Sequence, residues 1–146
     1  TPGSLDGVGD AASFRAPKGI AAAAGGVVFV ASATDNLIRK IVVGGDGKGT
    51  VSTVAGSGAG LKDGVGAAAS FNQPQDLAID KDGALYVADQ GNAAVRKVVV
   101  GADGKGTVST VYGGGAIKCF ANSIAISQAG KLYVTEIGLS RVALIQ

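Results

Sequence analysis

Short runs of apolar residues, each followed by turn-forming residues, succeed one another along the chain. In the middle of the sequence they lie at about 76–80, 84–89, 93–100 and 106–113. Each run is shorter than a typical helix and rich in Val, Ile and Leu, which is characteristic of β-strands. The first two are joined by Lys81-Asp82-Gly83, and Gly can adopt the positive φ that a hairpin turn needs. The pattern predicts a four-stranded antiparallel meander.

The same meander is repeated along the chain. Asp6-Gly7-Val8-Gly9 recurs as Asp63-Gly64-Val65-Gly66, a shift of 57 residues, and the sequence GKGTVSTV occurs unchanged at 47–54 and 104–111. A third copy begins after Lys118 without the Asp-Gly-Val-Gly segment and ends before its last strand. Self-similarity at such a period is the signature of a repeat architecture. The sequence therefore predicts two full repeats and a partial third.

Several predicted strands are apolar nearly without alternation. Ile41-Val42-Val43 and Val98-Val99-Val100 are examples. Such strands indicate a sheet that is covered on both faces, because a half-exposed strand alternates apolar and polar residues. Four-stranded sheets stacked face to face around an axis form a β-propeller. The predicted fold class is all-β, a propeller segment of four-stranded antiparallel blades.

The order of motifs in the second copy is more specific than the strand pattern. Between Asp63 and Gly113 it reads Asp-Gly-x-Gly, Ala-x-Phe, Pro, Leu-Tyr-Val-Ala-Asp, Val-Arg-Lys-Val and Val-Ser-Thr-Val-x-Gly, which resembles the NHL repeat. The first copy departs from it with Ser32 where Asp89 stands, and the third has Val142-Ala143 where Arg96-Lys97 stand. We therefore expect residues 1–146 to form one NHL-type segment, with blade 1 at about 18–56, blade 2 at about 75–113 and a partial blade 3 at about 122–146.

The resemblance also implies a propeller that closes with more blades, usually six in this family. A propeller needs about four to eight blades to close. The first and last blades of this chain should therefore expose apolar faces. Either the chain is a piece of a longer propeller, or other protein chains cover these faces, by self-association or in a larger complex. Related propellers include lyases and lactonases that hold a metal at the central axis with His and acidic residues.

Charge and hydropathy limit the kinds of partner. The formal net charge is only +2, and the 13 Lys and Arg residues are scattered. Strong binding to a phosphate backbone needs many of them on one face, so nucleic acid is an unfavoured partner. The longest uncharged apolar stretch, 19–33, is shorter than the roughly 20 residues of a spanning helix. We expect no membrane-spanning segment.

The candidate chemistry is sparse. The chain has no His, so a His-based metal site and a His general base are both excluded, and we expect neither an enzyme nor a cofactor. A carboxylate calcium site could use Asp6, Asp63, Asp46 or Asp103, but these residues more often fix turns through hydrogen bonds to the backbone. Cys119 is the only Cys and is expected to be a small buried apolar residue.

A contact surface is the remaining candidate site. We expect it to include Asp35, Arg39, Lys40, Asp89, Asn92, Arg96 and Lys97, beside rim loops at 33–36, 90–93 and 137–140. The two Arg-Lys pairs lie in third strands, where alternation sends the members of a pair to opposite faces. They could form a basic stripe for an acidic protein or RNA. Alternatively, they are solvated or paired with acids such as Asp35 and Asp89.

These observations favour an interaction or scaffold module that acts as a subunit of a larger assembly. Two alternatives stay open: a fragment of a propeller hydrolase or lyase whose metal ligands lie in further blades, and an RNA-binding NHL surface. The chain contains no Met, so we expect a processed chain or an excised fragment. A cleaved presequence would fit a lumenal or secreted destination.

Overall fold

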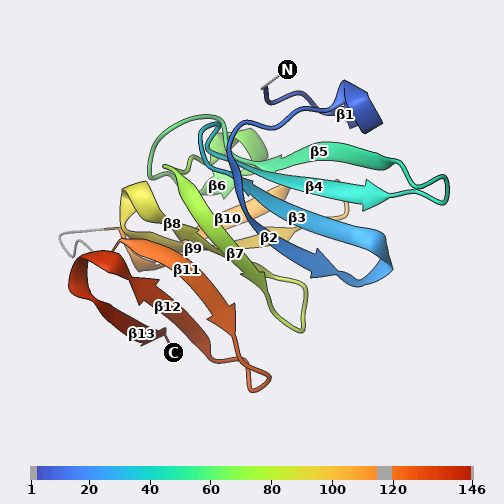
Figure 1. Cartoon of the computed structure of the whole chain (residues 1–146). Coiled ribbons are helices and arrows are strands. Elements are labelled where there is room, and N and C mark those ends of the chain that lie inside the picture. Colours follow the sequence, from blue (N-terminus) through green and yellow to red (C-terminus); the bar gives the residue numbers. More distant parts are fainter. Residues whose placement is uncertain (1–2, 115–119, 146) are drawn as a thin grey trace.

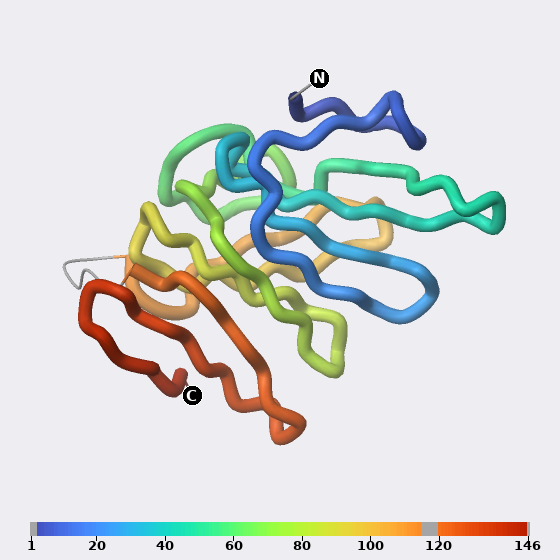
Figure 2. The backbone as a smooth tube through the Cα atoms, in the orientation of Figure 1, coloured from blue at the N-terminus to red at the C-terminus, as the bar shows by residue number. Residues whose placement is uncertain are grey.

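The fold is all-β, as the hydrophobic pattern predicts (Figure 1). The computed structural model describes residues 3–114 and 120–145. These residues form three antiparallel sheets, which we call blades 1, 2 and 3. The N-terminal end lies beside blade 1 and the C-terminal end in blade 3, at opposite ends of the stack (Figure 2).

Each blade is a meander in chain order. Blade 1 contains β1 (Gly7–Val8), β2 (Pro17–Ala23), β3 (Val27–Ser32), β4 (Leu37–Val43) and β5 (Gly49–Ala55). Blade 2 contains β6 (Gly64–Val65), β7 (Pro74–Ile79), β8 (Leu85–Asp89), β9 (Ala94–Val100) and β10 (Gly106–Gly113). Blade 3 contains β11 (Ala121–Ile126), β12 (Leu132–Glu136) and β13 (Arg141–Ile145). Single 3-10 turns follow some of the strands: η1 (Gly9–Ala11), η2 (Ala24–Gly26), η3 (Gly66–Ala68), η4 (Gln90–Asn92) and η5 (Ile137–Leu139).

Blades 1 and 2 have one strand more than the sequence pattern predicts. The strand β1 pairs with β5 through Gly7 and Val51, and β6 pairs with β10 in the same way through Gly64 and Val108. These extra strands are the Asp-Gly-Val-Gly segments, and two residues are too few to show the alternation that identifies a strand. Each segment precedes its blade in sequence and closes the outer edge of that blade.

The innermost strands of neighbouring blades lie side by side. The strand β2 packs on β7, and β7 packs on β11. A Cβ atom added at Gly19 of β2 would collide with the Cα atom of Asp76 in β7. Only Gly allows two backbones to approach so closely. Gly19 therefore fixes the distance between blades 1 and 2 at their inner edge.

The core lies between the blades. One cluster joins blades 1 and 2 and includes Phe29, Ile38, Phe71 and Leu85, all buried. A second, smaller cluster joins blades 2 and 3 around Val95 and also includes Ala88, Ile124, Leu132 and Val134. Both faces of blade 2 are therefore covered, which explains why its strands are apolar nearly without alternation.

Candidate interaction site

The Arg of each predicted basic pair is buried. Arg96 has no exposed surface, although Arg is rarely buried without a partner. Its Nη2 atom donates to the carbonyl oxygen of Lys62 at 2.8 Å and to Oδ1 of Asp63 at 2.9 Å. Its Nη1 atom donates to the carbonyl oxygen of Ser70 and to Oδ2 of Asp89, at 2.9 and 3.0 Å. The guanidinium group also lies 5.1 Å from the centre of the neighbouring ring of Phe71.

Arg39 makes the corresponding contacts in blade 1. Its Nη2 atom donates to the carbonyl oxygen of Leu5 and to Oδ1 of Asp6, at 2.8 and 2.7 Å. Its Nη1 atom donates to the carbonyl oxygen of Ser13 at 3.2 Å, and its guanidinium group lies 4.9 Å from the ring centre of Phe14. In each blade the buried Arg thus ties the segment that precedes the blade to the third main strand.

The Asp of each Asp-Gly-Val-Gly segment completes this arrangement. Asp63 accepts hydrogen bonds from the backbone N and Oγ1 of Thr110 at 3.1 and 2.9 Å, and Asp6 accepts the same two from Thr53. Burial acts to raise the pKa of Asp63, but the hydrogen bonds from Thr110 and the Arg96 charge outweigh it and lower the pKa. We call each group an arginine clamp; its members are Asp6, Phe14, Arg39 and Thr53 in blade 1 and Asp63, Phe71, Arg96 and Thr110 in blade 2.

A second carboxylate distinguishes the clamp of blade 2. Asp89 is fully buried and accepts hydrogen bonds from the backbone N of Asn72 and the Nδ2 of Asn92, both at 2.7 Å, as well as from Arg96. Its burial raises its pKa despite these contacts. In blade 1, Ser32 stands at this position and donates its Oγ to Asp35 at 3.1 Å.

Asp35 does not reach the buried Arg of its blade. Its carboxylate lies 4.0 Å from Nε of Arg15 instead. The expected pairing of the Arg-Lys pairs with nearby acids is therefore confirmed at Asp89 but not at Asp35.

The strand register corrects the alignment of the third copy. Val87 pairs with Arg96 in blade 2, and Val134 pairs with Ala143 in blade 3. Ala143-Leu144, not Val142-Ala143, therefore occupy the places of Arg96-Lys97. Within its described residues, blade 3 has neither the Asp-Gly-Val-Gly segment nor a buried Arg at this position.

The buried acid of blade 3 is Glu136, at the end of β12. It pairs with Arg141 on the neighbouring strand and accepts a hydrogen bond from the hydroxyl of Tyr112 in blade 2 at 3.3 Å. The third blade thus neutralises its buried carboxylate with an Arg from another position.

The Lys of each pair faces the other side of the sheet, as alternation predicts. Lys97 is partly exposed, and its Nζ lies 5.5 Å from the ring centre of Tyr86 on the face toward blade 3. Arg39, Arg96 and Asp89 have no exposed surface, so the expectation that they present charge to a partner is corrected. Their charges instead form ion pairs within the clamps. Of the seven residues expected in a contact surface, those that keep exposed area are Asp35, Lys40, Asn92 and Lys97.

Two turns expected from the sequence are confirmed. Oδ1 of Asp46 accepts a hydrogen bond from the backbone N of Lys48, and Oδ1 of Asp103 accepts one from the backbone N of Lys105, each at 3.0 Å.

The residues that the structure describes contain no group of three or more His, Cys, Asp or Glu side chains that could hold a metal. Cys119 lies outside the described residues. Across 3–114 and 120–145, no helix has the length and apolar character that crossing a membrane requires.

The two outer faces of the stack are apolar and exposed, as the repeat predicts. Ile20 in blade 1 is 67% exposed, whereas Leu77, its equivalent in blade 2, is 3% exposed because blade 1 covers it. Val142 in blade 3 is 64% exposed, whereas its equivalent Val95 is fully buried under blade 3. The exposed residues at the ends of the stack thus have the character of core residues.

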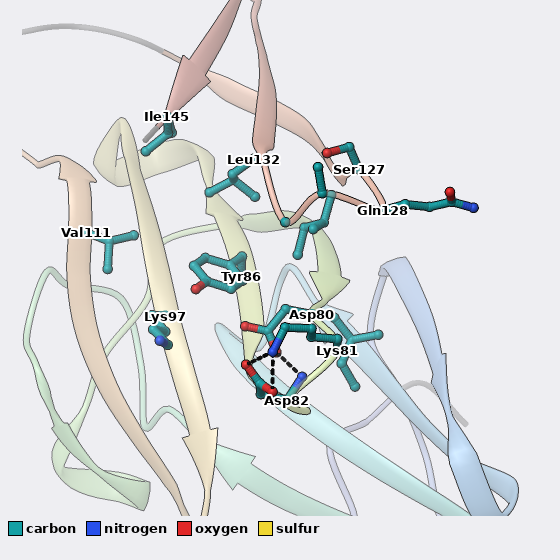
Figure 3. A pocket seen from close by; sticks show the side chains of 14 residues that line it. Asp80, Lys81, Asp82, Tyr86, Lys97, Val111, Ser127, Gln128, Leu132 and Ile145 are labelled. Atoms are coloured by element: carbon teal, nitrogen blue, oxygen red, sulfur yellow. Dashed lines mark hydrogen bonds and ion pairs between the residues drawn. The ribbon is translucent and has the colours of Figure 1, made fainter.

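A pocket of about 660 Å³ lies between blades 2 and 3 (Figure 3). Tyr86 projects into it, with Lys97 and Val111 of blade 2 to one side and Leu132 and Ile145 of blade 3 above it in the view. The turns at 80–82 and 127–130 also line it. The sequence did not predict this pocket.

Comparison with known proteins supports the architecture. Residues 71–98 match the model of the NHL repeat. Virginiamycin B lyase from Staphylococcus aureus is similar in structure, with a TM-score of 0.63 and 16% identity over 89% of this chain and 38% of the lyase. An auxiliary nutrient binding protein from Bacteroides thetaiotaomicron has a TM-score of 0.71 and 14% identity over 89% of this chain and 37% of that protein. The chain thus spans well under half of these structures. The sequence matches none of the curated proteins with which it was compared.

The expectation that the chain is not an enzyme was wrong as an inference from this fold. The similar structures include virginiamycin B lyase, and a catalytically inactive variant of it with quinupristin matches 100% of this chain and 41% of the lyase, at 18% identity and a TM-score of 0.63. The absence of His from these 146 residues excludes His chemistry only within them. The same architecture carries catalysis in a longer protein, so the fold itself does not separate enzymes from binding proteins.

Proposed function

Because the chain carries an NHL repeat within a segment of β-propeller fold, we propose that it functions as an interaction module that assembles with further blades through its two outer faces. The observation that carries this proposal is the difference between Ile20, 67% exposed, and its buried equivalent Leu77. A β-branched or Leu side chain gains about 1.5–3 kcal/mol from full burial. In an isolated chain the apolar side chains at both ends of the stack stay exposed to water, so this stabilisation is not gained.

The outer face of blade 1 repeats a surface that is packed inside the molecule. Besides Ile20, it includes Val28 and Ile41, both partly exposed. Their equivalents in blade 2 are Leu85 and Val98, which blade 1 covers completely. This face therefore fits the kind of surface that blade 1 presents to blade 2.

The outer face of blade 3 corresponds to the other face of a blade, the one that blade 2 turns toward blade 3. Tyr133 is 38% exposed, Leu144 is 45% exposed, and Val142 also lies on this face. The corresponding face of blade 2 packs on blade 3. The two ends of the stack are thus complementary, and an interface between them is head-to-tail. A second copy of the chain and another propeller segment both offer the required faces.

The native mass tests the proposal. We expect light scattering at tens of micromolar to give a mass above that of a monomer, and Ile20→Asp or Val142→Asp to return it to the monomer. Val65→Asp is the matched control, because Val65 is 49% exposed but lies on the edge strand β6, outside both faces. A folded monomer, or equal effects of all three variants, would contradict the proposal.

A further inference from the structure

The two blade-to-blade junctions differ at their rims. Between blades 2 and 3, Nε2 of Gln90 donates a hydrogen bond of 3.2 Å to Oδ1 of Asn122 and bridges the two blades. Between blades 1 and 2, Ala33 and Gln75 occupy the equivalent positions. The methyl group of Ala33 cannot make this bridge, and a pocket of about 550 Å³ lies there. Both blades beside this pocket are complete, so it belongs to the interior of the stack and not to one of its ends.

Polar side chains of both blades line the pocket. Oδ1 of Asn36, from the turn of blade 1, accepts a hydrogen bond from the backbone N of Gln73 at 2.7 Å. This contact turns the amide of Asn36 so that its Nδ2 atom stays available as a donor. Among the residues that the structure describes, the side chains of Thr34, Asn72 and Gln73 also have no hydrogen-bond partner. A ligand with oxygen acceptors would therefore find donors on both sides of the pocket.

Lys18, near the start of β2, supplies the charge of the pocket. Of the described residues that line the pocket, it alone carries a charged side chain, and it is exposed. None of the ion pairs among the described residues includes Lys18. An ammonium group forms strong charge-assisted hydrogen bonds with carboxylates and phosphates. A single Lys matches the one negative charge of a carboxylate, whereas a phosphate group carries nearly two.

The acids that lie beside lining residues in the sequence make other contacts. Asp35 lies in the turn of blade 1, but its side chain is only 8% exposed and contacts Ser32 and Arg15. Asp76 follows Gln75 in β7, and its Oδ2 atom accepts a hydrogen bond from the backbone N of Ile124 at 3.0 Å. Neither acid lines the pocket. The charge of Lys18 is therefore available to a ligand.

We propose that this pocket binds a small polar molecule that carries one carboxylate and further oxygen acceptors. The carboxylate pairs with the ammonium group of Lys18, while Thr34 and Asn72 donate to the neighbouring acceptors from opposite sides. The volume falls within the roughly 300–1,000 Å³ that is typical of small-molecule sites. Such a ligand would contact both blades and would replace the bridge that Gln90 and Asn122 make at the next junction.

A matched pair of small molecules tests the site. The probe is N-acetyl-β-alanine, which has one carboxylate and one amide oxygen, and the control is its neutral primary amide of almost the same shape. Amide NMR spectra of the isotope-labelled chain follow the titration. We expect saturable shifts in the millimolar range at the backbone amides of Thr34, Asn36, Asn72 and Gln73. The neutral control should bind about fivefold more weakly or less, because it cannot form the ion pair.

Two variants locate the binding. Lys18→Gln should weaken binding of N-acetyl-β-alanine by about fivefold. Its matched control is Lys48→Gln, in the exposed turn between β4 and β5, which should leave binding unchanged. Ala33→Gln introduces the side chain that bridges the next junction, and it should fill the pocket and weaken binding by about tenfold or more.

Three results would overturn the proposal. They are the absence of saturable shifts at the four pocket amides, equal binding of the acid and its neutral amide, and equal effects of Lys18→Gln and Lys48→Gln. Because both Lys side chains are exposed, neither of these variants should unfold the chain.

The ligand site goes beyond the proposed assembly, and the two can fail separately. The titration is repeated in the Val142→Asp variant, which alters the outer face of blade 3 and leaves the junction of blades 1 and 2 untouched. Binding of N-acetyl-β-alanine by a monomeric chain supports the ligand site even if the outer faces do not associate. A defined oligomer whose pocket amides do not respond supports only the assembly.

Discussion

The guanidinium group of Arg96 and the carboxylate of Asp89 form an ion pair of 3.0 Å in which neither side chain is exposed. Blade 1 places Ser32 where Asp89 stands, so Arg39 keeps a carboxylate partner only in Asp6, which is 48% exposed. Arg96 therefore neutralises a fully buried carboxylate, whereas Arg39, at the same repeat position, does not.

This difference predicts unequal costs for the same substitution. Arg96→Met leaves the buried charge of Asp89 without a cation and should lower the free energy of unfolding by about 3–5 kcal/mol. Arg39→Met leaves no fully buried carboxylate without a cation. It should lower the free energy of unfolding by about 1–3 kcal/mol, mainly through lost charge-assisted hydrogen bonds. Urea unfolding followed by circular dichroism measures both values. Adding Asp89→Asn to Arg96→Met should recover part of the loss, and equal losses in the two single variants would contradict the assignment.

The lowered pKa of Asp63 predicts a dependence of stability on pH. A carboxylate whose pKa is lower in the folded protein stabilises it at pH values above its ordinary pKa of 3.8, and this contribution disappears as the pH falls through the lowered value. Asp63→Asn should cost about 1 kcal/mol at pH 7, since the carboxylate is half-exposed and solvent screens it. The difference from the unaltered chain should shrink as the pH falls below 3.8. Urea midpoints at pH 7, 4 and 2.5 test this, and a constant difference would argue against a lowered pKa of Asp63.

The close approach of the inner strands predicts that Gly19 is intolerant of a side chain. Gly19→Ala places a methyl group against the backbone of Asp76 and should destabilise the chain by about 1–3 kcal/mol. Gly45→Ala is the matched control, because a Cβ at Gly45 meets no atom within 4 Å and φ there is not positive. It should change stability by less than about 0.5 kcal/mol. Thermal unfolding compares them, and similar effects at both positions would contradict the packing of β2 on β7.

A repeated left-handed residue offers a stabilising change. Ala93 and Asn36 occupy equivalent positions with φ of 49° and 58°, a conformation that costs residues other than Gly about 1–2 kcal/mol. Ala93→Gly should raise the free energy of unfolding by about 0.5–1 kcal/mol after the greater flexibility of Gly in the unfolded chain is included. Asn36→Gly should give little gain, since it removes a 2.7 Å hydrogen bond from the backbone N of Gln73 to Oδ1 of Asn36. Chemical unfolding measures both, and a loss of stability in Ala93→Gly would contradict the strained backbone.

The main strands of blade 2 were predictable because their apolar runs and turn residues are strong local signals. The predicted runs agree with β7 to β10 within about two residues at each end. The short strand β6 was not predictable in this way, because its two residues acquire their role from pairing with β10 more than 40 positions later in the sequence. The register of β13 in blade 3 likewise depends on its pairing with β12. This pairing shows that Ala143, and not Val142, is the equivalent of Arg96.

The burial of the Arg residues is the most instructive failure of the sequence reasoning. A charged pair such as Arg96-Lys97 in a strand is normally read as exposed, because burying an unpaired charge is costly. The partner that makes burial possible, Asp63, lies 33 residues earlier in the chain. A signal was nevertheless present: Asp, Phe, Arg and Thr recur together at the same spacing in the first two copies. Residues that repeat as a set across a duplication are candidates for mutual contact, even when they are far apart in sequence.

The arginine clamp has a practical consequence for rebuilding such blades. Blade 3, as far as the structure describes it, has Ala143 at the Arg position and lacks the Asp-Gly-Val-Gly segment, so both halves of the clamp are missing together. Inserting Arg there alone would bury a cation with no carboxylate to receive it, and adding the segment alone would leave it loosely attached. The segment and the Arg therefore form one unit, and both parts would have to be transferred together to give an engineered blade the clamp.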